Sequence, residues 1–185
     1  SGAEAIIILE NFAHTLEKII SHTQIKIVIV ASMGDLLGGL KGSLVNFVVR
    51  NLKKMVPAFS LPNAIRFNNV QNEARSMTLR PVELGHDDIA FLQYTGGTTG
   101  LSKGAMLSHR NVIANLMQNE AWLQPALHKE PKLESLTFVC ALPLYHIFAL
   151  TICCLMGTRI GGLNILIPNP RDIPGLVKTL SKHRF

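Results

Sequence analysis

Short apolar runs alternate along this chain with longer segments whose apolar residues recur every three or four positions. The short runs are typical of strands and the periodic segments of amphipathic helices. Strands are predicted at 6–9, 25–31, 64–67, 89–94, 105–107, 136–142 and 163–167, and helices at 12–20, 42–55, 110–123, 146–156 and 173–183. The remainder of 63–87 is polar, so we expect a surface connection there. Strands that alternate with helices predict an α/β fold, with a parallel or mixed sheet and helices on both faces.

Two of these segments carry further expectations. The run at 25–31 is nearly uninterrupted, as in a parallel strand covered on both faces. The helix predicted at 42–55 has an apolar face and a basic face; the apolar face holds Leu44, Val48, Leu52 and Met55, and the basic one Arg50, Lys53 and Lys54. Such a helix either lies on a membrane surface or packs on a sheet with its charged face in water. The pattern leaves both interpretations open.

Composition narrows the class of protein. The chain has 185 residues, of which 48% are hydrophobic and 16% charged, with a net charge of +6. Soluble proteins carry about 25% charged residues, so this chain is poor in charge but rich enough in apolar residues for a packed core. The basic residues are scattered and aromatic residues are few, which argues against nucleic-acid binding. The positive charge fits a small anion such as a nucleotide equally well.

One uncharged stretch, Leu136–Met156, is long enough to span a bilayer. Pro143 and His146 interrupt it, so we predict a buried strand, a loop and a buried helix, with a transmembrane span as the alternative. Cysteines 140, 153 and 154 lie in apolar surroundings and form no CxxC pair. They are expected to be buried, reduced thiols, which indicates a cytoplasmic protein.

The segment Tyr94-Thr-Gly-Gly-Thr-Thr-Gly-Leu-Ser-Lys-Gly-Ala105 carries the strongest chemical signal. Its glycines allow close backbone approach to a ligand, and its threonines and Lys103 add donors for phosphate oxygens. It is not a Walker A loop, because Gly104 follows the lysine, and its glycine spacing differs from GxGxxG. A flexible surface turn is the alternative, although such turns rarely combine a buried strand before them with a lysine at their end.

This segment resembles the phosphate-binding signature of the adenylate-forming (AMP-binding) enzymes, with Ser102 where the common form has proline. A second family motif follows as Ala141-Leu-Pro-Leu-Tyr-His146. Four further segments resemble bacterial long-chain fatty-acid–CoA ligases: 11–18, 45–50, 108–115 and 169–178. The resemblance covers essentially the whole chain.

The resemblance implies an enzyme that forms an acyl-adenylate from a long-chain fatty acid and MgATP, then transfers the acyl group to coenzyme A. The nucleotide-binding positions implied are Tyr94, Thr95, Gly96, Gly97, Thr98, Thr99, Gly100, Lys103 and Gly104. The catalytic candidates are Lys103, which would offset charge on departing pyrophosphate, and His146, which would face the substrate carboxylate and the α-phosphate. His146, Ile147, Phe148 and Leu150 are implied to line the acyl site, for which core packing is an equally good explanation of the three apolar residues.

Three neighbouring residues have plainer explanations. Ser108 is expected to cap a helix with His109 as its neighbour, and Asp87 and Asp88 to form a solvated turn, so no metal site is predicted within the chain.

The resemblance further implies that residues 1–185 are part of a large N-terminal AMP-binding domain. The principal Mg²⁺-binding acid and the small C-terminal domain would lie outside the chain, which alone would not complete the reaction. Two alternatives stay open: an adenylate-forming enzyme acting on an aryl or amino acid, or a catalytically dead nucleotide-binding or interaction module. A slice of a larger fold should also expose apolar patches and tend to associate.

Overall fold

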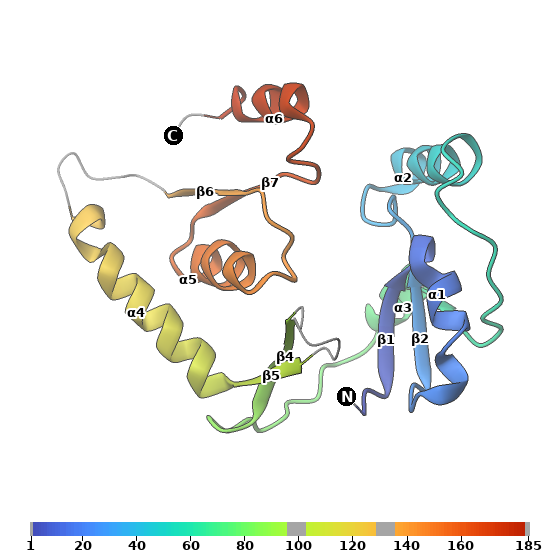
Figure 1. Cartoon of the computed structure of the whole chain (residues 1–185), viewed down its shortest axis with the longest axis horizontal. Coiled ribbons are helices and arrows are strands. Elements are labelled where there is room, and N and C mark those ends of the chain that lie inside the picture. Colours follow the sequence, from blue (N-terminus) through green and yellow to red (C-terminus); the bar gives the residue numbers. More distant parts are fainter. Residues whose placement is uncertain (1, 96–102, 129–135, 184–185) are drawn as a thin grey trace. The chain divides into compact units, whose positions relative to one another are not determined.

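The computed structural model describes residues 2–95, 103–128 and 136–183. The chain divides into two compact units, Ser1–Pro81 and Val82–Phe185, which are described separately below. Both contain strands and helices (Figure 1). The predicted α/β class is therefore confirmed, with strands paired in both the parallel and the antiparallel sense.

The first unit is built on a three-stranded parallel sheet in the order β1–β2–β3. These strands are β1 (Ala5–Leu9), β2 (Ile27–Ala31) and β3 (Ile65–Arg66). The β1–β2 connection contains α1 (Ala13–Glu17) between two 3-10 turns, at Glu10–Phe12 and Ile20–His22. The β2–β3 connection contains α2 (Gly39–Phe47), which continues as a π-helical segment (Val48–Leu52), and α3 (Phe67–Ala74) follows β3. The polar connection predicted at 63–87 thus contains a helix that the pattern did not indicate.

The core of this unit lies on one face of the sheet. Val28 and Val30 of β2 are buried against Leu16 of α1. On the opposite face of β2, Ile27 is 51% exposed while Ile29 and Ala31 are half-buried, so the expected cover on both faces is only partial in the described structure. The strand alternates instead, as a strand with one packed face does.

The helix predicted at 42–55 forms, but it turns a different face inward. Leu44, Leu52 and Met55 of the predicted apolar face are exposed, whereas Gly42 and Val49 are buried. The reason is local: the backbones of Gly34 and Gly42 meet so closely that a Cβ on either would overlap the carbonyl oxygen of the other. Because only glycine permits this approach, Gly42 determines which face of α2 packs against the rest of the unit.

Arg50 also departs from the prediction, because it binds a buried carboxylate although its side chain stays partly exposed to water. Glu10 is 1% exposed and accepts hydrogen bonds from Nε and Nη2 of Arg50, both at 2.9 Å, and from Nη1 of Arg66 at 3.2 Å. Arg50 Nη2 also lies 2.9 Å from Ser32 Oγ. The hydrogen bonds to Glu10 raise the pKa of Arg50. A charged carboxylate is tolerated in the interior only when it is paired in this way.

The second unit contains two strand pairs. The hairpin strands β4 (Ile89–Thr95) and β5 (Lys103–Ser108) are antiparallel, and β6 (Thr137–Cys140) and β7 (Leu163–Leu166) are parallel. The helices of this unit are α4 (His109–Leu127), a π-helical segment (Ala149–Met156) that continues into α5 (Gly157–Arg159), and α6 (Ile173–Leu180). Ser108 caps α4 as predicted, in a capping box with Asn111.

The uncharged stretch Leu136–Met156 divides as predicted, into strand β6, a turn and a buried helix. Among the described residues, none of the helices has both the length and the apolar character that crossing a membrane requires. Cys140 and Cys153 are buried and Cys154 half-buried, all three as free thiols. These cysteines were predicted to be buried and reduced, and the structure agrees for the first two.

Candidate active site

The β4–β5 hairpin holds the two ends of the predicted phosphate-binding loop side by side. Thr95 pairs with Lys103, and Tyr94 with Gly104. The predicted loop residues Gly96, Gly97, Thr98, Thr99 and Gly100 lie outside the described residues. Within the described part of the chain, Lys103 forms no ion pair, so its ammonium group is available to an anion.

Tyr94 and Gly104 fit together across the hairpin. The ring of Tyr94 covers Gly104 so closely that a Cβ there would lie 3.2 Å from Cζ of the tyrosine. Thr95 Oγ1 donates a hydrogen bond to the carbonyl oxygen of Lys103 at 3.4 Å. Both contacts join the strands directly beside the loop, so they fix the position at which the loop leaves and re-enters the hairpin.

His146 lies in an exposed turn immediately before the helix at 147–159. The turn is closed by a hydrogen bond from the His146 amide to the Pro143 carbonyl oxygen at 2.8 Å. The amide of Phe148 donates to Nδ1 of the His146 ring at 3.3 Å. A ring nitrogen that accepts from an amide carries no proton, so the neutral imidazole has its hydrogen on Nε2. His146 can therefore donate one hydrogen bond to an oxygen outside the turn.

Gln93 connects the hairpin to this turn. Its Nε2 donates to the carbonyl oxygen of Tyr145 at 3.1 Å, the residue directly before His146. The structure thus brings the two sequence motifs together, although they are some fifty positions apart. Sequence reasoning missed Gln93; the available signal was a single amide in the otherwise apolar run Ile89–Leu92 and Tyr94.

A cavity of ≈450 Å³ lies between α4 and the helix that follows His146. Its lining residues are Leu107, Asn111, Val112, Asn115, Asn119, Ile147, Phe148, Thr151 and Ile152. Ile147 and Phe148 were predicted to line an acyl site, whereas Leu150 and His146 are not part of this lining. The asparagines recur every fourth position and so share one face of α4. This row of asparagine side chains was not predicted, although the four-residue spacing of the asparagines can be seen in the sequence.

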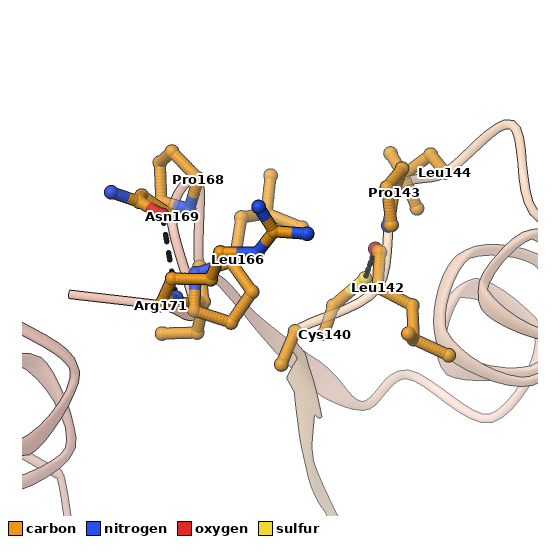
Figure 2. Close-up of a pocket in the computed structure, with 11 residues that line it drawn as sticks. Cys140, Leu142, Pro143, Leu144, Leu166, Pro168, Asn169 and Arg171 are labelled. Carbon is orange, nitrogen blue, oxygen red and sulfur yellow. Dashed lines mark hydrogen bonds between the residues drawn. The ribbon is translucent and has the colours of Figure 1, made fainter. Parts of the chain in front are cut away.

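A second cavity, of ≈620 Å³, opens at the carboxyl ends of the parallel strands β6 and β7. Figure 2 shows Cys140, Leu142, Pro143 and Leu144 on one side of it and Leu166, Pro168, Asn169 and Arg171 on the other. Ligands of open α/β sheets commonly bind at this edge. The cavity shares Pro143 with the His146 turn, which places it next to the candidate site.

Asp87 and Asp88 each have a structural explanation in their hydrogen bonds. Asp87 accepts hydrogen bonds from Arg110 at 3.1 and 3.3 Å, which lower its pKa, and Asp88 accepts from the Gly85 amide at 2.6 Å.

Burial raises the pKa of the Cys153 thiol to about 11. In the ranges that the structure describes, no three His, Cys, Asp or Glu side chains gather as metal ligands.

In this α/β chain a glycine- and threonine-rich sequence joins β4 to β5, and Gln93 of β4 contacts the Pro-Leu-Tyr-His turn. Such a glycine-rich sequence is typical of a nucleotide-binding domain. The AMP-binding enzyme family matches residues 5–185, and the chain belongs to that family. The chain is 55% identical over its whole length to the long-chain-fatty-acid–CoA ligase of Escherichia coli O157:H7. It spans 32% of that protein, about a third of its length.

Two other similarities are more distant. The 4-coumarate–CoA ligase 2 of Nicotiana tabacum is 30% identical over 75% of the chain, which corresponds to 25% of the tobacco protein. The fatty acyl-adenylate ligase of L. pneumophila, solved with acyl adenylate and pyrophosphate, superposes with a TM-score of 0.56 at 23% identity. The match covers 94% of this chain and 27% of that structure, and it establishes the shared fold.

Proposed function

We propose that the chain is part of the N-terminal domain of an ATP-dependent long-chain fatty-acid–CoA ligase. The observation that carries this proposal is the match to the bacterial ligase over every residue, at an identity far above that to the plant aryl-acid ligase. The span of the match, a third of the bacterial protein, supports the view that the remaining catalytic parts belong to a longer polypeptide.

In the proposed reaction the carboxylate of the fatty acid attacks the α-phosphorus of ATP, and pyrophosphate leaves with the electron pair of the cleaved P–O bond. The segment between Thr95 and Lys103 would hold the β- and γ-phosphates, and the Lys103 ammonium would offset the charge that develops on pyrophosphate. The structure supports this assignment through the hairpin, which anchors both ends of the segment and leaves Lys103 without a carboxylate partner among the described residues.

His146 would orient the attacking acid. Its Nε2–H is free to donate to the substrate carboxylate or to an α-phosphate oxygen, because the Phe148 amide occupies Nδ1. Gln93 acts as a positioning residue, since its hydrogen bond to Tyr145 ties the His146 turn to the hairpin. Held geometry of this kind contributes much of the rate in reactions where the protein supplies no covalent group.

The acyl chain would enter the cavity lined by Ile147 and Phe148. In the second step the thiol of coenzyme A would attack the acyl carbon of the adenylate, and AMP would leave with the electron pair of the cleaved C–O bond. Magnesium would accompany ATP through an acid elsewhere in the polypeptide; the described residues hold no cluster of three or more His, Cys, Asp or Glu side chains that could bind a metal. The proposed location is the cytoplasm, which the free thiols support. Peripheral contact with the membrane that holds the substrate is also part of the proposal.

The test is ATP–pyrophosphate exchange by the longer polypeptide, assayed with palmitate, 4-coumarate and phenylalanine at equal concentration. Exchange that depends on palmitate, followed by palmitoyl-CoA formation when coenzyme A is added, is the expected result. Preference for 4-coumarate or phenylalanine would reassign the substrate within the family. Exchange with none of the three acids, in a protein that is folded, would instead support a module without adenylating activity.

A further inference from the structure

Helix α2 presents a row of large apolar side chains to solvent. Leu36 precedes the helix and is 80% exposed, and within the helix Leu40 is 94%, Leu44 64% and Phe47 55% exposed. Positions 40, 44 and 47 lie on one side of a helix, and Leu36 lies in the exposed turn that precedes it. We call these four residues the α2 apolar face. In Figure 1, α2 (cyan) lies beyond the ends of β1 and β2.

The opposite side of the helix is pinned, so this face cannot simply turn inward. Gly42 packs on the backbone of Gly34, and Asn46 Oδ1 accepts a hydrogen bond from the Gly34 amide at 2.8 Å. One turn later Arg50 is held by buried Glu10. A rotation of α2 that buried Leu40 and Leu44 would break all three contacts. The outward direction of the apolar face therefore follows from the fold of this unit.

The charge along this part of the chain is mostly positive, although Asp35 directly precedes Leu36 and Glu73 lies in α3. Half-buried Asp35 accepts hydrogen bonds from the Ser32 amide and from the side chains of Asn46 and Asn68. Residues 36–72 contain no Asp or Glu and five basic residues, Lys41, Arg50, Lys53, Lys54 and Arg66. The two arginines are bound to Glu10. The three lysines are exposed, and none of them forms an ion pair within the described ranges. The basic set that faces an external partner is therefore Lys41, Lys53 and Lys54, not the set with Arg50 that the sequence suggested.

We propose that the α2 apolar face, together with Lys41, Lys53 and Lys54, docks on the surface of an anionic lipid bilayer. A bilayer supplies both complements at once: acyl chains receive leucine and phenylalanine, and anionic headgroups attract lysines that reach them on flexible stems. Lysines next to a membrane bind anionic lipid with nearly additive strength. This surface gives a location to the membrane contact proposed above, and lipid binding requires no ligase chemistry.

The experiment is co-sedimentation of the 185-residue chain, and of the longer polypeptide, with two kinds of vesicle. One contains phosphatidylcholine alone and the other an equimolar mixture of phosphatidylcholine and phosphatidylglycerol. We expect binding to the mixed vesicles that falls by at least about 100-fold when Lys41, Lys53 and Lys54 are all changed to Glu, because each lysine contributes about 1 kcal/mol and the glutamates add repulsion. The triple change Leu40→Ser, Leu44→Ser and Phe47→Ser should abolish binding to the mixed vesicles.

Control variants change other exposed residues of the same kinds, with three lysines for the charge control and two large apolar residues for the apolar control. Lys18→Glu, Lys178→Glu and Lys182→Glu carry the same charge change on other exposed lysines, and Leu79→Ser and Trp122→Ser remove other exposed apolar side chains. All variants should keep the wild-type circular dichroism spectrum, and the controls should bind as the wild type does. Equal loss of binding in the controls, or none in the α2 variants, would overturn the proposal.

Comparing the 185-residue chain with the longer polypeptide tests whether another segment of the same protein, rather than a bilayer, covers the α2 apolar face. Binding by the 185-residue chain but not by the longer polypeptide would show that another segment of the protein covers the α2 apolar face, and would also overturn the proposal. ATP–pyrophosphate exchange is measured on the same variants in the absence of vesicles. Loss of lipid binding with normal exchange separates this surface from the proposed function, and vesicle binding without exchange would refute the proposed function alone.

Discussion

Replacing Glu10 by Gln should strongly destabilise the first unit. The carboxylate is 1% exposed and accepts three hydrogen bonds from two arginines, at 2.9, 2.9 and 3.2 Å. Removing one member of a buried ion pair costs about 3–5 kcal/mol, because the remaining charge stays unpaired. Here the arginine side chains are 42% and 54% exposed and can recover water. We therefore expect the lower end of that range, about 3 kcal/mol.

The matched control is Glu4→Gln in the same unit. Glu4 also forms an ion pair, at 2.7 Å from Lys26, but both side chains are mostly exposed. Exposed pairs contribute at most about 1 kcal/mol, so this change should alter stability little.

Urea unfolding followed by circular dichroism measures both variants, and hydrogen exchange localises the effect. With a slope of about 1–3 kcal/mol per molar urea, Glu10→Gln should lower the unfolding midpoint by roughly 1–3 M. Amides in residues 1–81 should lose protection while those in 82–185 keep it. Equal midpoints for the two variants would refute the view that the buried carboxylate organises this unit.

Three further predictions concern packing, thiols and positioning. Gly42→Ala should destabilise the chain by about 1–3 kcal/mol in urea unfolding, because its Cβ has no room, whereas Gly39→Ala meets open space and should be neutral or stabilising. Cys153 has a pKa of about 11, so at pH 8 roughly one thiol in a thousand is ionised; it should react with a disulfide reagent far more slowly than Cys154, and faster as pH rises toward 11. Gln93→Ala should lower kcat of ATP–pyrophosphate exchange about tenfold at unchanged KM for ATP, because it disturbs the turn rather than binding.

The sequence predicted the elements well where one local signal dominated. The apolar run at 6–9 became β1, and Ser108 with its helix pattern became a capped α4. The division of Leu136–Met156 into strand, turn and helix followed from Pro143 and His146. These features depend on neighbours in the chain, which is why periodicity and capping residues were enough to find them.

The orientation of α2 could not be predicted in the same way. Helical periodicity showed that one side is apolar, and the usual expectation is that this side packs inward. The choice was decided instead by the Gly34–Gly42 contact and by the Glu10–Arg50 pair, which join residues eight and forty positions apart. Contacts between distant residues leave no periodic trace, so the hydrophobic pattern favoured the wrong face.

The candidate site shows the same division. The motifs at Tyr94–Ala105 and Ala141–His146 could be recognised from their residue types, and the family match over residues 5–185 includes both. The contact that Gln93 makes between them, and the hydrogen bond that assigns the proton of His146 to Nε2, are visible only in the folded structure. Both are single hydrogen bonds to backbone groups, which no sequence pattern specifies.

The most direct measurement of the proposed site compares His146→Ala with His109→Ala in palmitate-dependent ATP–pyrophosphate exchange by the longer polypeptide. His109 begins α4 and serves the fold through its backbone amide, which donates to the Asp88 carbonyl oxygen at 3.0 Å. We predict that His146→Ala lowers kcat on the order of 100-fold while His109→Ala stays within about twofold of the wild type. Normal exchange by His146→Ala, or equal loss in both variants, would contradict the assignment of the His146 turn to the reacting carboxylate.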